Sequence, residues 1–268
     1  MNGDNRMNKS GITDLITIEE MNQILINYRI GKKPLASLLG WGETTVIRYM
    51  EGDLPTREYS DKLLYILHNP GYFYEILQQN KGRLTPVAYR KCCQAVESSL
   101  LESKIKVVAQ YIINKLEGHI SLFELQMYLY FIQGFYLALE KEPMFEDDYI
   151  INEQNMPYKN ISESFTSHGF KILPIKKDAL KSKEKEFIED LIVAQSSYGP
   201  TMLSRMLRYE IVLMNLSRDL ENQKIISKQT IAKYFTGVLT SNNIISTKQI
   251  QRYILKVYAT LLEAEWSI

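Results

Sequence analysis

The chain has 268 residues, 45% of them hydrophobic, which is enough for one large domain or two modest domains with buried cores. Its 32 Lys and Arg residues are balanced by 31 Asp and Glu residues, so the net charge is +1. This balance excludes a uniformly basic protein, and any nucleic-acid surface must be a local patch.

The hydrophobic segments predict neither export nor a membrane span. The N-terminal segment 1–14 is polar and has no apolar run that could form the core of a signal peptide. The most apolar stretch, residues 127–139, is too short to cross a bilayer core of about 30 Å and contains Gln133. We therefore expect a cytoplasmic protein in which residues 127–139 form a buried helix.

Residues 18–80 show helical periodicity with frequent breaks. A first apolar face predicts a helix that ends near Gly31, and a second short helix begins around Pro34 and ends at Gly40. A third segment opens after Gly42 and ends at Gly52, and residues 59–67 resume an amphipathic pattern. Two short helices separated by a glycine turn are typical of a helix-turn-helix, so we assign residues 1–80 to such a domain.

The second helix of a helix-turn-helix lies in the major groove, where its outer face needs polar side chains. We expect Val46, Ile47 and Met50 to pack inward. The predicted DNA-binding residues are the polar side chains of this helix and the neighbouring cations: Lys32, Lys33, Thr44, Thr45, Arg48, Tyr49 and Arg57. A helical hairpin without a ligand is the competing interpretation.

The charge of this segment weakens the DNA interpretation, because residues 1–80 carry eight basic and ten acidic side chains. The basic residues between 29 and 57 nevertheless cluster around the proposed motif. Residues 81–104 follow as a predicted basic connector with some helix, in which Lys81, Arg83, Arg90 and Lys91 stand out. A second protomer or this connector could supply further phosphate contacts.

From residue 105 onward the pattern is strongly helical. Ser121 and Glu124 form a capping box at the start of the second helix of this region. Residues 143–174 are less regular, and the sequence KILPI at 171–175 predicts a short strand. Further helices are predicted at 183–195, 201–209, 227–235 and from Thr247 onward, so the fold class is mainly α.

The segment KKPLASLLGWGETTVIRYMEGDLPTREYSDKLLYILHNP resembles the helix-turn-helix of bacterial antitoxin repressors. The matching positions are Leu39, Gly40, Thr45, Glu51, Gly52 and Pro55. Many members of that group carry a Cys-x-x-Cys zinc ribbon ahead of the motif. The two cysteines here, Cys92 and Cys93, are adjacent and lie after it, so we expect packed thiols and no metal.

The second half resembles the Panacea domain, a SocA-like, phage-associated antitoxin module whose hallmark helix is L-x-L-Q-K-L-L-Y-F-x-Q-G-x-x-L followed by P-L-F. This chain reads FELQMYLYFIQGFYLALEKEPMF. The residues in register are Leu125, Gln126, Leu129, Tyr130, Gln133, Gly134, Leu137, Pro143 and Phe145, and later Tyr198, Gly199, Leu203, Ser204, Glu210, Ile226, Ser227 and Phe235. The resemblance covers residues 105–236 and leaves 237–268 as a C-terminal helical extension.

This resemblance implies a domain that neutralises a toxin protein by direct binding. The chain departs from the family pattern at two places. At 151–157, INEQNMP stands in place of A-W-x-x-G-P-V, and further on Leu207-Arg208 stands in place of T-H. We expect these positions to lie outside the core and to determine which toxin the domain binds. The candidate toxin-binding residues are Asn155, Met156, Pro157, Leu207 and Arg208.

Catalytic motifs do not emerge from the sequence. It contains no G-x-x-x-x-G-K-[ST], H-E-x-x-H or G-x-S-x-G, and His68, His119 and His168 are far apart in the chain. We therefore expect no enzyme and no cofactor. Leucine and aromatic residues at helical spacing, as in 122–140, favour burial over a direct ligand role.

Two functions of different classes remain. The first is an antitoxin of a bacterial or prophage toxin-antitoxin system, which binds its cognate toxin and regulates its own operon through operator DNA. The alternative is a phage or prophage transcriptional regulator whose C-terminal helical domain dimerises or senses a ligand. Both include DNA binding, and a homodimer is compatible with either.

Overall fold

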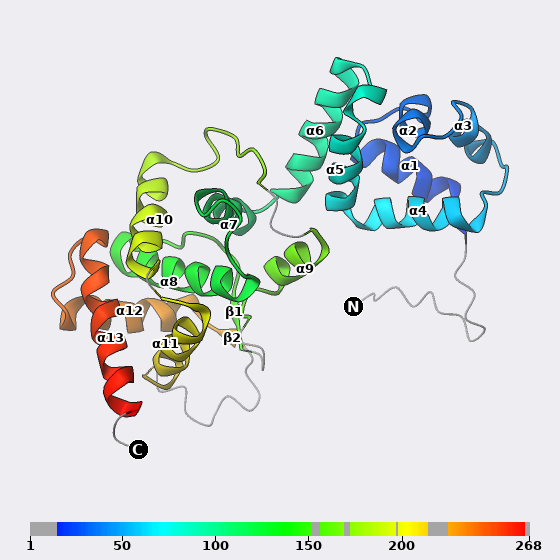
Figure 1. Ribbon diagram of the computed structural model, residues 1–268. Helices are drawn as coiled ribbons and strands as arrows, with labels where there is room; N and C mark the ends of the chain where they lie inside the picture. The colour runs from blue at the N-terminus through cyan, green and yellow to red at the C-terminus, as the bar shows by residue number, and fades with distance from the viewer. Residues whose placement is uncertain (1–14, 152–155, 169–171, 197, 214–224, 266–268) are drawn as a thin grey trace, which may run out of the picture. The chain divides into compact units, whose positions relative to one another are not determined.

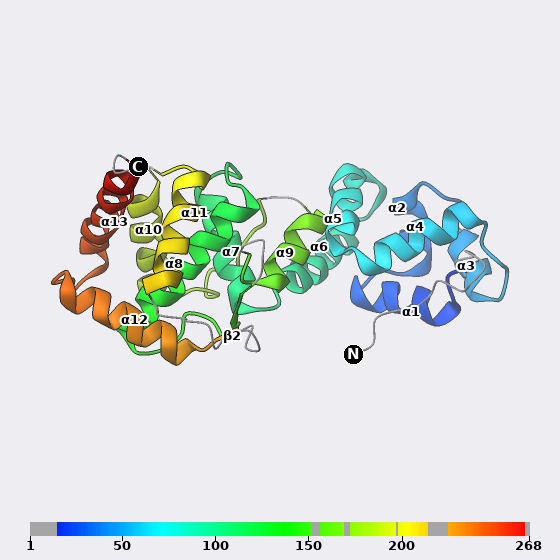
Figure 2. The ribbon, with the colours of Figure 1, turned by 90° about the horizontal axis from the view of Figure 1, so that it is seen from below.

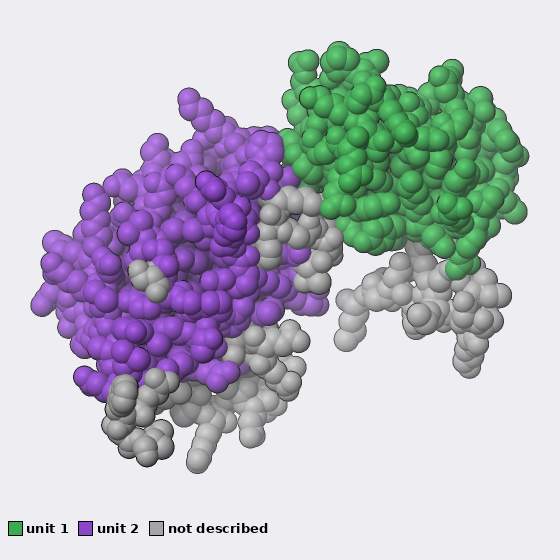
Figure 3. All heavy atoms as spheres, in the orientation of Figure 1, with its two compact units in different colours: residues 1–100 green, residues 101–268 purple. Residues whose placement is uncertain are grey.

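The computed structural model describes residues 15–151, 156–168, 172–196, 198–213 and 225–265 (Figure 1). The fold is mainly α, which confirms the predicted class. The chain divides into two compact units, residues 1–100 and residues 101–268, which are coloured separately in Figure 3. Each unit has its own hydrophobic core.

The first unit contains six helices within its described residues, and local sequence signals explain most of their ends. Thr17 and Glu20 form a capping box that starts the first helix, and Gly40, with φ of 77°, ends the second in the left-handed conformation that glycine tolerates. The elements are α1 Ile18–Asn27, α2 Lys32–Leu39, α3 Thr45–Met50, α4 Arg57–His68, α5 Pro70–Gln79, the 3-10 turn η1 Lys81–Arg83 and α6 Pro86–Leu100.

The core of the first unit lies among α1, α2, α4 and α5. The ring of Tyr28 stacks on Phe73 with ring centroids 3.9 Å apart, and its hydroxyl donates a hydrogen bond of 2.8 Å to the carbonyl of Ile66. Burial of this phenol raises its pKa well above the ordinary value. The buried tyrosine thus keeps a hydrogen-bond partner while its ring fills the core.

The structure corrects the predicted connector at 81–104. Helix α6 packs against α5, and Cys92 and Val96 are fully buried in the same core as Tyr28 and Phe73. The division of the chain therefore falls after Leu100. Arg90 and Lys91 lie on the exposed side of α6, opposite the apolar face that packs in the core.

The second unit is built around α8, which spans Leu122–Glu140 and begins at the predicted capping box of Ser121 and Glu124. All residues from Leu125 to Ala138 are buried. Figures 1 and 2 show α8 among its neighbours. These helices are α7 Lys104–Lys115, α9 Lys159–His168, α10 Ser182–Gln195, α11 Pro200–Leu213 and α12 Lys228–Ser241.

The strand expected at 171–175 is not formed. Residue 171 is outside the described residues, and 172–175 have no regular secondary structure; the carbonyl of Leu173 instead accepts a hydrogen bond of 2.7 Å from the side-chain amide of Asn114. The two-stranded sheet pairs β1, Tyr149–Ile150, with β2, Ile225–Ile226, in antiparallel register. A strand needs a partner for its backbone groups, which local sequence does not specify.

The predicted C-terminal extension also belongs to the core of the second unit. After the 3-10 turn η3, Thr247–Gln249, helix α13 spans Ile250–Glu265 and packs against α10 and α11. Ile250, Tyr253 and Ile254 are buried with the residues of α8. Residues 237–268 are therefore part of one domain rather than an addition to it. Among the described helices, none combines the length and apolar character that crossing a bilayer requires.

Candidate functional site

The segment predicted to be a helix-turn-helix consists of α2, the turn at 40–44 and α3. The N–H of Trp41 donates a hydrogen bond of 2.8 Å to the carbonyl of Ala36, which closes the end of α2. Val46 is fully buried where α3 packs on α2. The ring of Trp41 packs at a tilt of 32° against that of Tyr59 of α4, with ring centroids 4.3 Å apart, so the turn is fixed to the rest of the unit.

The structure places five of the seven predicted DNA-binding side chains on the surface and one at partial exposure. The exposed residues are Lys32, Lys33, Thr44, Arg48 and Arg57, and Thr45 is half-buried. The expected exposure of Tyr49 is not found, because its side chain is only 7% exposed and its ring lies beside that of Tyr59. Tyr49 follows Val46 by three residues and therefore shares its inward face.

Arg48 has a carboxylate partner that the sequence analysis did not find. Its Nε donates a hydrogen bond of 2.8 Å to Oδ2 of Asp53, and the two side chains are 64% and 53% exposed. This hydrogen bond, together with the charge of Asp53, raises the pKa of Arg48. Gly52, with φ of 113°, turns the chain so that Asp53 faces back toward α3. If Arg48 contacts a DNA base, its guanidinium must either leave the Asp53 carboxylate or bind Asp53 and the base together.

Arg83, which the sequence places in the predicted basic connector, lies against the helix-turn-helix. Its guanidinium covers Gly40, since a Cβ placed on Gly40 would lie 2.4 Å from Nη1 of Arg83. The hydroxyl of Ser37 donates a hydrogen bond of 3.0 Å to the carbonyl of Arg83. Both contacts bring η1 against the C-terminal end of α2. The helix-turn-helix therefore has a cationic neighbour from a segment more than 40 residues later in the chain.

In the second unit, two of the predicted toxin-binding positions are internal. Leu207 is 0% exposed, because it lies one helical turn after the buried Leu203 on α11. Pro157 is buried, and its carbonyl accepts a hydrogen bond of 3.2 Å from the N–H of Ile150. These two positions shape the core rather than a contact surface. Met156 is half-buried, Arg208 is exposed, and Asn155 lies outside the described residues.

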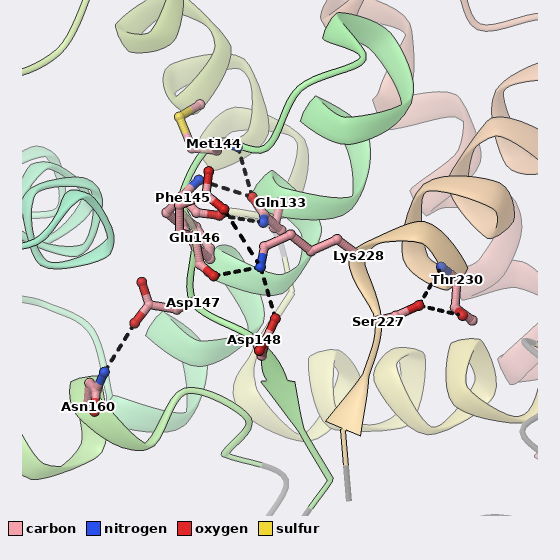
Figure 4. Close-up of polar contacts among 10 residues, drawn as sticks. All are labelled: Gln133, Met144, Phe145, Glu146, Asp147, Asp148, Asn160, Ser227, Lys228 and Thr230. Carbon is pink, nitrogen blue, oxygen red and sulfur yellow. Dashed lines mark hydrogen bonds and ion pairs between the residues drawn. The ribbon is translucent and has the colours of Figure 1, made fainter. Parts of the chain in front are cut away.

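Two buried glutamines of α8 hold the irregular segment that follows it. Oε1 of Gln133 accepts hydrogen bonds from the N–H groups of Met144 and Phe145 at 2.9 and 3.3 Å, and its Nε2 donates to the carbonyl of Phe145 at 2.8 Å (Figure 4). Gln126 makes the same pair of bonds with the backbone of Tyr158, at 2.9 and 3.0 Å. Side-chain amides thus replace a strand partner for this segment.

Charged contacts fasten the same segment from outside. Nζ of Lys228 lies 2.9 Å from Oδ1 of Asp148 and 2.6 Å from the carbonyl oxygen of Glu146, and Asn160 donates to Asp147 (Figure 4). Lys228 is the first residue of α12, two residues after β2, and its side chain reaches Asp148, the residue before β1. These contacts position the backbone between α8 and β1. The carboxylates of Asp147 and Asp148 already accept hydrogen bonds from Asn160 and Lys228.

A groove of about 640 Å³ lies between α12 and α13. Its floor contains Tyr234 and Tyr253, whose hydroxyl oxygens are 3.1 Å apart, and Lys233 and Lys256 stand at its margin. Nζ of Lys256 donates a hydrogen bond of 3.2 Å to Oδ1 of Asn242. Hydroxyls, apolar surface and two cations together could accept an anionic ligand or an acidic side chain.

Within the described residues, no three His, Cys, Asp or Glu side chains lie together as a metal site would require. Comparison of the chain with protein-family models, with curated proteins and with solved structures gives no match.

Proposed function

We propose that this chain is the antitoxin of a bacterial or prophage toxin-antitoxin system. Its second unit binds the cognate toxin directly, and its first unit binds operator DNA through α2 and α3. The protein acts in the cytoplasm, where both partners would be found. The proposal rests on the sequence resemblance to antitoxin modules and on the surface that the helix-turn-helix exposes.

The observation that carries the proposal is that several residues matching the antitoxin pattern have specific structural roles in the second unit. Gln126 and Gln133 brace the segment after α8, and Gly134 leaves the space that the ring of Phe235 occupies. Four positions that match the antitoxin pattern are therefore specific structural requirements, and composition alone would not produce them. This supports a common architecture, from which the toxin-binding role is inferred.

The DNA-binding part is supported by the exposure of Thr44 and Arg48 on α3 and of Lys33 on α2. If Arg48 contacts a base edge, Arg48→Ala should raise the Kd for the operator about 5- to 150-fold and relax specificity at one position. Lys33→Ala should weaken binding to every sequence alike and flatten the salt dependence. Gel-shift titration of the region upstream of the gene, at two salt concentrations, measures both effects. No retardation by the wild type at low salt would overturn this part.

The toxin-binding part is tested by co-expression of residues 101–268 with the product of the adjacent gene in a growth assay. The second unit should restore growth without the first, and Arg208→Glu should reduce rescue while the thermal melt is unchanged. Leu207→Ala should abolish rescue through unfolding, because it leaves a core cavity that costs about 2–5 kcal/mol. Rescue by residues 1–100 but not by a folded second unit would contradict the proposal.

The groove between α12 and α13 favours a second candidate, a phage or prophage transcriptional regulator that senses an anionic ligand. In that case a small anion bound at Lys233 and Lys256 would change DNA affinity, and no toxin gene would be adjacent. Double substitution of these lysines by Gln separates the candidates. A regulator would lose its ligand response, whereas an antitoxin would keep its DNA affinity under all ligand conditions.

A further inference from the structure

A basic surface borders the turn of the helix-turn-helix. It consists of η1 and the first turns of α6, and its position relative to α2 is set by two contacts that involve Arg83. The backbone carbonyl of Arg83 accepts the hydroxyl hydrogen of Ser37 at 3.0 Å, and its guanidinium lies over Gly40. Because Gly40 is the C-cap of α2, the Arg83 charge lies at the start of the turn that leads to α3.

Two cations of this surface line one groove. Lys81 and Arg90 line a groove of about 520 Å³ in which Tyr89 is the central aromatic side chain. Nζ of Lys81 lies 5.2 Å from the centroid of the Tyr89 ring, and the Tyr89 hydroxyl donates a hydrogen bond of 2.8 Å to Oε1 of Gln78. Among the described residues that line the groove, none carries a carboxylate. Both cations therefore face solvent beside a fixed ring and without a competing acid in the groove.

This surface changes the electrostatics of the first unit. Residues 1–80 have two more acidic than basic side chains, whereas residues 81–100 contain four basic residues and the single acidic residue Glu97. Glu97 lies two turns further along α6 than Arg90, is half-buried, and is not among the described residues that line the groove. The excess positive charge of the unit is thus concentrated at one edge of the helix-turn-helix.

We propose that Lys81, Arg83 and Arg90 bind backbone phosphates of duplex DNA that flank the groove entered by α3. This inference rests on the proposed DNA binding of the first unit and adds a second contact region to it. A polyanionic backbone fits three cations placed along an edge, and phosphate contacts position a protein on DNA without reading sequence. The adjacency of Arg83 to the turn, rather than charge alone, identifies DNA as the ligand.

The test measures the salt dependence of binding for full-length variants. Each phosphate contact contributes about −0.9 to the slope of log K against log salt. The double variant Lys81→Gln/Arg90→Gln should make the slope less negative by about 1.8. Between 50 and 200 mM salt, its affinity should consequently fall about 12-fold less than that of the wild type. Arg83 is kept in this variant, because its removal would also uncover Gly40.

Two controls separate charge from packing. Lys81→Arg/Arg90→Lys keeps both charges and should retain the wild-type slope, and Lys176→Gln removes an exposed charge from the second unit and should change nothing. Thermal melts verify that each variant is folded. A folded double Gln variant with the wild-type slope overturns this inference, and a protein partner at this surface would give that same result.

The outcomes also distinguish this inference from the proposed function. If the wild type retards the upstream fragment and Arg48→Ala relaxes its specificity, while the double Gln variant keeps the wild-type slope, only the second contact region is wrong. If the wild type binds neither the upstream fragment nor an unrelated duplex at low salt, both proposals fail together.

Discussion

The ring of Phe235 lies against the backbone of Gly134, at the place where α12 packs on α8. A Cβ added to Gly134 would lie 2.2 Å from Cε2 of Phe235 and less than 3 Å from two further ring atoms. Both residues are buried, and the ring also makes edge contacts with Tyr130 and Phe135. The absence of a side chain at position 134 therefore sets how closely these two helices approach.

Gly134→Ala should destabilise the second unit although alanine is the better helix former. The helix-propensity gain is about 1 kcal/mol, but the new methyl group must displace an enclosed ring, and overpacking costs about 1–3 kcal/mol or more. Denaturant unfolding of the full chain should show a net loss for this variant.

Gly237→Ala on α12 is the matched control, because nothing lies within 4 Å of the Cβ it would add. This substitution should be neutral or should stabilise the unit by up to about 1 kcal/mol. The double variant Gly134→Ala/Phe235→Leu should recover part of the loss. Equal effects of the two glycine substitutions would contradict the packing argument.

Gln133→Met should cost at least about 2 kcal/mol of unfolding free energy. The substitution preserves length but leaves the buried N–H groups of Met144 and Phe145 and the carbonyl of Phe145 without their partner. Urea denaturation measures the loss. Gln229→Met, at an exposed position of α12, should change stability by less than about 0.5 kcal/mol. A similar small change at Gln133 would show that the segment after α8 is held by other contacts.

Asp53→Asn should strengthen DNA binding by the first unit. The change removes a negative charge beside α3 and releases the Arg48 guanidinium from its ion pair, which, as an exposed pair, stabilises the fold little. Kd should fall about 1.5- to 5-fold, the equilibrium factor that corresponds to such a pair. Fluorescence anisotropy with the upstream duplex measures the change.

The control for Asp53→Asn is Glu163→Gln, which breaks an exposed pair with Lys159 in the second unit and should leave Kd unchanged. Weaker binding by Asp53→Asn would mean that the ion pair orients Arg48 toward DNA instead of competing with it.

Fragments should fold according to the two cores. Residues 1–100 should unfold cooperatively, whereas residues 1–80 lack α6 and lose the burial of Cys92 and Val96. Full burial of one aliphatic side chain stabilises a fold by about 1.5–3 kcal/mol, so the shorter fragment should unfold at a distinctly lower temperature. Circular dichroism melts compare the two fragments. Identical melting curves would place the domain boundary near residue 80 after all.

Gly40→Ala should destabilise the first unit by about 1–2 kcal/mol, because an L-residue is strained at the φ of 77° that ends α2. The nearby Arg83 guanidinium is the end of a flexible side chain and can move aside, so it adds little to this cost. Gly82→Ala is the control, since it has open space for a Cβ, and it should be close to neutral in the same thermal melt.

The sequence by itself determined the helices whose ends carry local chemical signals. Ser121 and Glu124 begin α8, Gly40 ends α2, and the largely apolar stretch at 127–139 predicted a buried helix. These features depend on residues within one turn or on the composition of one helix. They can therefore be derived before any tertiary contact is known.

Only the tertiary structure decided which faces meet. The apolar side of α6 could not be assigned to the first core until α5 was placed beside it, and Leu207 and Tyr49 became internal because the packed elements bury those helix faces. The same holds for the ion pair of Arg48 with Asp53 and for the position of Arg83 over Gly40. The periodicity of a helix specifies its apolar face. Which element covers that face, and which charged side chains lie next to it, depends on packing between segments distant in sequence.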